Sequence, residues 1–207
     1  IHTIQWAKYL TEQGMNVHVV SQQPKGEDFP KNIPLSILPF KGFLGYFLNT
    51  FALKKLLKEI KPDLLNAHYA SGYGTTARLV NFHPYVLSVW GSDVFEFPYR
   101  SFFHKKLLQK NLKSADVIAS TSLSMASQTQ LFVDHKKIEI TPFGVDLEKF
   151  NPSCCDKNAN VQTICIGTVK TLKHVYGIDV LLKALSIVYK NTKNEFPEVS
   201  NQLNFRI

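Results

Sequence analysis

Short apolar runs alternate with amphipathic segments along almost the whole chain, and this alternation restricts the fold more than any other feature of the sequence. The apolar runs have the length and the β-branched content of buried strands, whereas the segments between them have helical spacing. Strands that alternate with single helices build βαβ units, in which helices cover a parallel sheet on both faces. The sequence therefore predicts an α/β fold with a doubly wound, Rossmann-like parallel sheet.

The expected elements follow one another in a regular order. The expected strands are residues 17–21, 35–40, 64–68, 85–90, 115–120, 138–141, 163–167 and 203–207. The expected helices are residues 1–14, 46–60, 73–82, 100–113 and 178–189, and one that Ser122 or Ser124 caps and that continues to Phe132. In the helix of residues 46–60 we expect Phe47, Phe51 and Leu57 to share one side.

A polar stretch at residues 156–160 interrupts this alternation and predicts a domain boundary between about residues 151 and 161. Residues 1–152 then form one Rossmann-like domain, and residues 161–207 begin a second. A doubly wound domain starts with a strand and a glycine-rich turn, but this chain starts within a helix. We therefore expect a piece of a longer protein that lacks the first strand of its first domain and most of its second.

The net charge of +8 and the isoelectric point of about 9.3 fit phosphorylated substrates, an anionic membrane surface or nucleic acid. Nucleic acid is the least favoured of these partners, because the lysines are scattered and no nucleic-acid-binding module is visible. No apolar run approaches about 18 residues, so no transmembrane helix is expected. The three cysteines lack metal-ligand spacing, and no signal-peptide core is visible, which favours a reduced, cytoplasmic protein.

Residues 140–152 form a distinctive segment that reads ITPFGVDLEKFNP. Gly144 allows a tight turn, and Asp146 can cap a turn through its side chain. The segment resembles the "P-N-G-V-D-x-x-x-F-x-P" hinge of retaining glycosyltransferases of the GT-B fold, family 4 (glycosyl transferases group 1), with Phe143 where asparagine is commonest. In that family the hinge leads from the acceptor-binding domain to the nucleotide-sugar domain, so Gly144 becomes a substrate-binding candidate. An ordinary strand–turn connection is the alternative.

A second resemblance lies in residues 66–74, which read NAHYASGYG and follow the pattern "H-A-H-Y-A-x-x-x-G" of the same family. His68 stands where the family has a histidine near the transferred sugar, and it is the catalytic candidate. An imidazole can hydrogen-bond a sugar or the reaction centre. The alternative is a structural histidine at the end of a strand.

A third resemblance lies in residues 89–95, VWGSDVF, which are similar to "V-H-G-S-D-V/I". It marks Gly91, Ser92 and Asp93 as substrate-binding candidates, because a glycine admits a ligand close to the backbone and the two side chains can bond sugar hydroxyls. Trp90 occupies the position of a frequent histidine, so no role of that histidine carries over. The alternative for Asp93 is a cap on the next turn.

Residues 166–179 resemble the opening of the family's donor domain, "V-G-R-L-x-x-x-K-G-x-D-x-L-L-x-A". In the family an arginine and a lysine hold the nucleotide diphosphate, but here Thr168 and Tyr176 replace them. Lys170 and Lys173 are the available substitutes and the candidates for binding the donor phosphates. The alternative is a pair of solvated lysines on a loop.

The family resemblance implies retaining transfer of a sugar from a UDP or GDP donor to a hydroxyl on a glycan or lipid-linked acceptor, without a metal or other cofactor. Bacterial surface polysaccharide or lipopolysaccharide synthesis is the expected pathway. The family's "Glu-x7-Glu" segment is not in the sequence, so we expect the chain to be inactive by itself. A GT-B nucleotide-sugar epimerase and a non-catalytic α/β ligand-binding module are the alternatives.

A basic amphipathic helix is expected at residues 100–113, where lysines share the helix with Phe102 and Phe103. Such a helix can dock on an anionic membrane surface, helped by the loop of residues 40–47. This would place the protein peripherally on the inner face of the membrane. The alternative is an ordinary helix that packs on the sheet and has a solvated basic face.

Overall fold

A computed structural model of the chain describes residues 2–134, 136–148, 150–154, 164–195 and 203–206. The chain divides into two compact units, Ile1–Gly144 and Val145–Ile207. This division falls before the expected boundary, part of which lies outside the described residues. The two predicted domains stay a prediction, and the units are described separately below.

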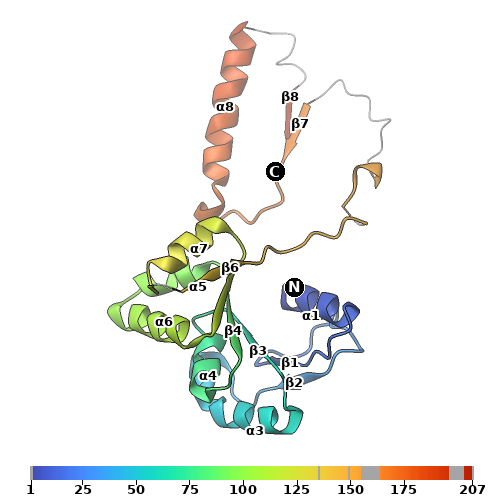
Figure 1. Ribbon diagram of the computed structural model, residues 1–207. Helices are drawn as coiled ribbons and strands as arrows, with labels where there is room; N and C mark the ends of the chain where they lie inside the picture. Colours follow the sequence, from blue (N-terminus) through green and yellow to red (C-terminus); the bar gives the residue numbers. More distant parts are fainter. Residues whose placement is uncertain (1, 135, 149, 155–163, 196–202, 207) are drawn as a thin grey trace. The chain divides into compact units, whose positions relative to one another are not determined.

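The first unit contains a four-stranded parallel sheet (Figure 1). Its strands are β3 (Leu65–His68), β4 (Tyr85–Val89), β5 (Val117–Ser120) and β6 (Ile138–Ile140), which pair in this order. The helices that follow them are α4 (Tyr73–Val80), α5 (Ser92–Phe95), α6 (Phe102–Ser114) and α7 (Leu123–Gln130). The predicted Rossmann-like α/β fold is confirmed, although α5 was not predicted.

The remaining strands of this unit form a separate parallel pair, β1 (Val19–Ser21) and β2 (Leu35–Ile37), which follows helix α1 (His2–Glu12). The hydroxyl oxygen of Tyr73 on α4 accepts a hydrogen bond of 3.0 Å from the backbone N–H of Gln22, directly after β1. This bond connects the end of the small sheet to a helix of the large one. The expected strands are therefore present, but they belong to two hydrogen-bonded sheets.

The main core lies between the large sheet and its helices. Leu108 and Leu112 of α6 and Leu87 and Ile118 of the sheet have no exposed surface. Full burial of such a side chain contributes about 1.5–3 kcal/mol. The apolar side of α6 therefore belongs to the core, as expected for an amphipathic helix that covers a sheet.

The prediction of one continuous helix over residues 46–60 was wrong. The structure has two helices, α2 (Gly42–Leu48) and α3 (Thr50–Ile60), which meet at the fully buried Asn49. The Asn49 amide accepts a bond of 3.1 Å from the Phe40 N–H and donates one of 2.8 Å to the Phe40 carbonyl. Most of the expected loop at residues 40–47 is therefore helical.

The break at Asn49 also changes which side chains point outward. Leu57 is buried, as predicted, but the side chain of Phe51 is 82% exposed. Phe47, on the other helix, is 36% exposed. The expectation that these three residues share one side of a single helix was wrong, because Phe47 belongs to α2 and, within α3, Leu57 faces the core whereas Phe51 faces solvent.

The second unit contains a parallel pair of strands, β7 (Ile164–Gly167) and β8 (Leu203–Arg206). Helix α8 (Ile178–Glu195) lies between them in the sequence, which makes a βαβ unit. These are the elements expected for the start of a second Rossmann-like domain. Among the described residues of the whole chain, every helix is too short or too polar to span a membrane.

The buried side chain of Asn111 connects α6 to the segment that follows β3. Its Nδ2 donates hydrogen bonds of 2.8 Å to the carbonyl of Ala70 and to the hydroxyl of Thr75. Its Oδ1 accepts a bond of 2.8 Å from Nε of Arg78. Since Asn111 has no exposed surface, water cannot replace these partners when the side chain is removed.

We predict that Asn111→Ala lowers the free energy of unfolding by about 2–4 kcal/mol, because it leaves buried polar groups unpaired. Urea denaturation followed by circular dichroism measures the change. The matched control is Lys110→Ala, one position earlier on the exposed side of α6, which should change stability by less than about 0.5 kcal/mol. Equal effects of the two substitutions would show that the Asn111 network contributes little.

Candidate functional site

The segments marked by the sequence analysis in the first unit meet at one edge of the large sheet. His68 is the last residue of β3, and Trp90 directly follows β4. The ring centroids of His68 and Trp90 are 4.7 Å apart, and those of Trp90 and Phe143, which follows β6, are 5.6 Å apart. Carboxyl ends of parallel strands form the ligand-binding edge of open α/β sheets. The structure therefore brings together three stretches that are distant in the sequence.

A fourth ring completes this group, that of His2 in the first turn of α1. It stacks on the Phe143 ring with centroids 3.9 Å apart and an interplanar angle of 7°. It also meets the Trp90 ring edge to face at 5.7 Å. We call His2, His68, Trp90 and Phe143 the aromatic cluster. His2 was not among the predicted site residues, because no spacing in the chain connects α1 to the ends of β4 and β6.

His68 is held in the cluster by a hydrogen bond between its Nδ1 and the hydroxyl of Thr3, at 3.1 Å. Burial lowers the pKa of His68 to about 4, since the charged imidazolium loses its hydration. At neutral pH the ring is therefore uncharged, with one N–H and one lone pair. Such a ring can orient a ligand by hydrogen bonding but carries no positive charge.

Asp93, the residue after Ser92, is fully buried. It lies where the loop after β4 meets the loop after β3. Its carboxylate accepts backbone hydrogen bonds from Ala70 and Gly91, both at 2.8 Å, and from Trp90 at 3.1 Å. Burial raises its pKa, while these bonds act in the opposite direction. The carboxylate thus joins the two loops, and the predicted contact of Asp93 with sugar hydroxyls stays a prediction.

The loops that Asp93 joins also contain unusual backbone conformations. Gly91 has a φ of 136°, which side-chain-bearing residues rarely adopt. Tyr69, directly after His68, has a φ of 81°, and its hydroxyl hydrogen-bonds that of Ser92. A non-glycine residue with such a φ is uncommon and is enriched at functional sites. Tyr69 was not among the predicted site residues, since a positive φ leaves no sequence signal at a tyrosine.

The expected tight turn at Gly144 is absent. Gly144 does not have a positive φ, and nothing lies within 4 Å of the position that its Cβ would occupy. The conformational freedom of glycine is therefore not used here. The predicted cap at Asp146 is confirmed, because its Oδ1 accepts a hydrogen bond of 3.1 Å from the N–H of Glu148.

Lys170 and Lys173 belong to the second unit, and the structure does not define where they lie relative to His68. Both are exposed, and the Lys170 ammonium lies 5.2 Å from the centroid of the Tyr176 ring. Lys173 precedes a short 3-10 helix, His174–Tyr176. Their role in binding donor phosphates stays a prediction.

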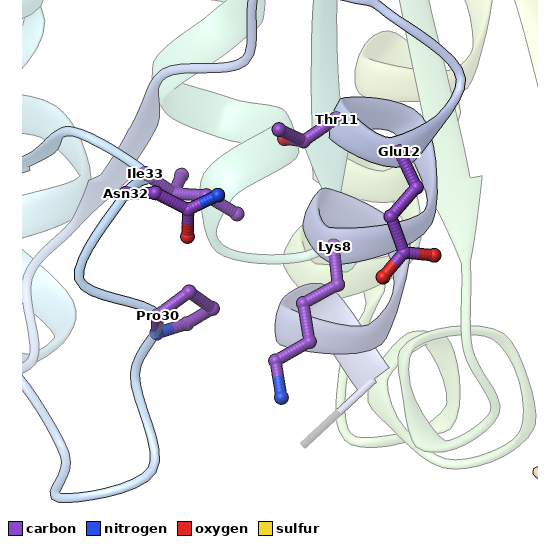
Figure 2. A pocket seen from close by; sticks show the side chains of 6 residues that line it. All are labelled: Lys8, Thr11, Glu12, Pro30, Asn32 and Ile33. Atoms are coloured by element: carbon purple, nitrogen blue, oxygen red, sulfur yellow. The ribbon is translucent and has the colours of Figure 1, made fainter.

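A separate hollow of about 380 Å³ opens between α1 and the chain before β2 (Figure 2). Its lining residues are Lys8, Thr11, Glu12, Pro30, Asn32 and Ile33. None of them belongs to the segments marked by the sequence analysis. The aromatic cluster, with the loops that Asp93 joins, is therefore the candidate site.

An open parallel sheet flanked by helices places the chain in the Rossmann-like α/β class, whose ligands bind at the carboxyl ends of the strands. Comparison with known families gives a more specific assignment, because residues 1–122 match the model of the family described as "Glycosyl transferase 4-like". The chain belongs to this family. The match includes His68, Gly91, Ser92 and Asp93, and it ends before the segments of residues 140–152 and 166–179.

A curated relative is similar over part of the chain. The chain is 29% identical over 96 residues to the putative teichuronic acid biosynthesis glycosyltransferase TuaC of Bacillus subtilis (strain 168). This match covers 45% of the chain and 24% of the relative. The chain thus spans about a quarter of the length of this relative.

The low pKa of His68 predicts a loss of stability in acid. Between its ordinary value of 6.5 and about 4, the unfolded chain binds a proton that the folded chain does not, so acidification favours unfolding. From about pH 7 to about pH 4.5 this contributes a loss of about 2.5 kcal/mol. Urea denaturation at both pH values measures it.

The control for this prediction is His68→Asn, which removes the titrating group. The substituted chain should lose about 2.5 kcal/mol less than the original chain over the same pH interval. The other groups, including His18, whose burial also lowers its pKa, titrate in both chains. Identical pH dependence of the two chains would contradict the assigned pKa.

Proposed function

We propose that the protein to which this chain belongs is a retaining glycosyltransferase that moves a sugar from a nucleotide-sugar donor to a hydroxyl acceptor. The observation that carries the proposal is the meeting of His68 with the Trp90–Asp93 loop at the ligand-binding edge of the sheet. Both belong to the part of the chain that matches the glycosyl transferase 4-like family. In the reaction the bond from the anomeric carbon to the diphosphate breaks. A bond to the acceptor oxygen forms on the same face of the sugar, and the proton of the acceptor hydroxyl passes to the departing nucleoside diphosphate.

His68 acts in this proposal as an uncharged hydrogen-bonding group. Since its Nδ1 interacts with Thr3, a sugar hydroxyl would meet the ring at Nε2. Trp90 and Phe143 add apolar ring surface next to it, against which the C–H groups of a sugar can pack. A half-buried group of this kind, held in place by Thr3, favours one sugar position without having to reorganise during the reaction.

The donor diphosphate would interact with the lysines of the second unit. Lys170 and Lys173 lie on the exposed loop after β7, where two ammonium groups can offset the charge that develops on the leaving diphosphate. We propose UDP or GDP as the nucleotide. We also propose an acceptor in cell-surface polysaccharide synthesis, which the similarity to a putative teichuronic acid biosynthesis glycosyltransferase supports.

We predict that His68→Ala in the full-length protein lowers kcat by about 10²–10³-fold, because a hydrogen bond to the reacting sugar is lost. Transfer from labelled UDP- and GDP-sugars to an extracted glycan acceptor measures the change. The matched control is His104→Ala in α6, whose imidazole bonds Ser101 and which should leave kcat within about twofold. Donor binding without any transfer would favour a non-catalytic module.

We also predict that chelation of divalent metal ions leaves the transfer rate unchanged, because lysines take the place of a metal at the diphosphate. Assays of the full-length protein with and without EDTA test this point. A rate that falls with EDTA and returns on addition of Mg²⁺ or Mn²⁺ would refute the metal-free mechanism. It would leave the assignment as a glycosyltransferase intact.

A further inference from the structure

Helix α2 presents an unusual apolar surface to solvent. Leu44 is 68% exposed and Phe43 is 60% exposed. The Phe43 and Phe47 rings, one turn apart, lie edge to face with centroids 5.6 Å apart. The large apolar residues exposed on and beside this helix, which we call the α2 patch, are Phe40, Phe43, Leu44, Phe47, Leu48 and Phe51.

The packing of the opposite side of α2 fixes this orientation. Gly45 is buried so closely that an added Cβ would lie 2.5 Å from the carbonyl oxygen of Phe40. The Tyr46 ring packs edge to face on Tyr73, and the Tyr46 carbonyl accepts a bond of 2.7 Å from the hydroxyl of Thr76. The helix therefore cannot turn its phenylalanines inward without breaking these contacts.

The stretch of sequence that contains the patch carries charge of one sign. Residues 29–58 include five lysines and no aspartate or glutamate. On α3 the exposed Phe51 is followed, at helical spacing, by the exposed Lys54, Lys55 and Lys58. The acidic group nearest in sequence on this helix is Glu59, 4.0 Å from Lys55 at the far end of the row.

A shallow hollow lies beside this row of lysines. Its volume is about 390 Å³, and its lining residues are Lys54, Leu57, Lys58, Val80, Asn81 and Phe82. Two ammonium groups over an apolar floor can hold a phosphate that is attached to an aliphatic chain. The hollow thus continues the patch from aromatic side chains to cationic ones.

We propose that the α2 patch binds the surface of an anionic lipid bilayer. Phenylalanine and leucine side chains would enter the headgroup region, while the lysines of α3 contact lipid phosphates. A second copy of the chain fits this surface poorly, because two such faces would bring like charges together. The patch includes residues 40–47, which were expected only to assist a membrane contact of α6, and the proposal does not depend on transferase activity.

Sedimentation of the protein with vesicles tests the proposal. The protein should bind vesicles of phosphatidylglycerol and phosphatidylcholine, but not of phosphatidylcholine alone, and added salt should weaken the binding. The double substitution Phe43→Ser and Leu44→Ser should lower the partition coefficient at least about tenfold. Lys54→Glu with Lys58→Glu should do the same.

The matched control is Phe102→Ser with Phe103→Ser on α6, where both rings are also exposed. It should leave vesicle binding unchanged. All substituted side chains are exposed, and unchanged thermal unfolding would show that each variant folds. The proposal fails if the unmodified protein ignores anionic vesicles, or if only the α6 substitutions reduce binding. It also fails if the α2 substitutions instead abolish a dimer in solution.

Discussion

The candidate site depends on how the backbone of one buried residue, Ala70, is held. Its N–H donates to the carboxylate of Asp93, and its carbonyl accepts from the amide of Asn111. Both side chains are fully buried and come from different elements, the loop after β4 and helix α6. Because unpaired polar groups are costly in the interior, these bonds have few alternatives. They fix the segment after β3 and, with it, the position of His68.

This constraint explains the electrostatic character of the site. Burial lowers the pKa of His68 to about 4, so its imidazole is uncharged at neutral pH and in mild acid. Asp93 is the carboxylate nearest in the chain to Trp90, and its oxygens accept hydrogen bonds from backbone N–H groups. The site therefore favours hydrogen bonding and ring packing over acid–base chemistry. A sugar, with hydroxyl groups on its rim and C–H groups on its faces, is a suitable ligand.

The two proposed surfaces of the first unit use opposite physical properties. The aromatic cluster gathers rings from α1, β3 and the loops after β4 and β6 into a half-buried group. The α2 patch leaves its rings exposed, because Gly45 and Tyr46 occupy the inner side of the helix. A protein that binds lipid through the second surface would act on acceptors at the membrane.

The sequence by itself determined the α/β class and the order of most elements, because strand and helix periodicities are local properties of the chain. It also placed His68 and Gly91 at strand ends, since a parallel sheet collects those ends at one edge. The tertiary structure decided the break at Asn49, which depends on the amide reaching the backbone of Phe40. It likewise decided that His2 joins the aromatic cluster and that Asp93 faces backbone N–H groups. These contacts join residues whose spacing in the chain carries no periodic signal, so only the folded arrangement could define them.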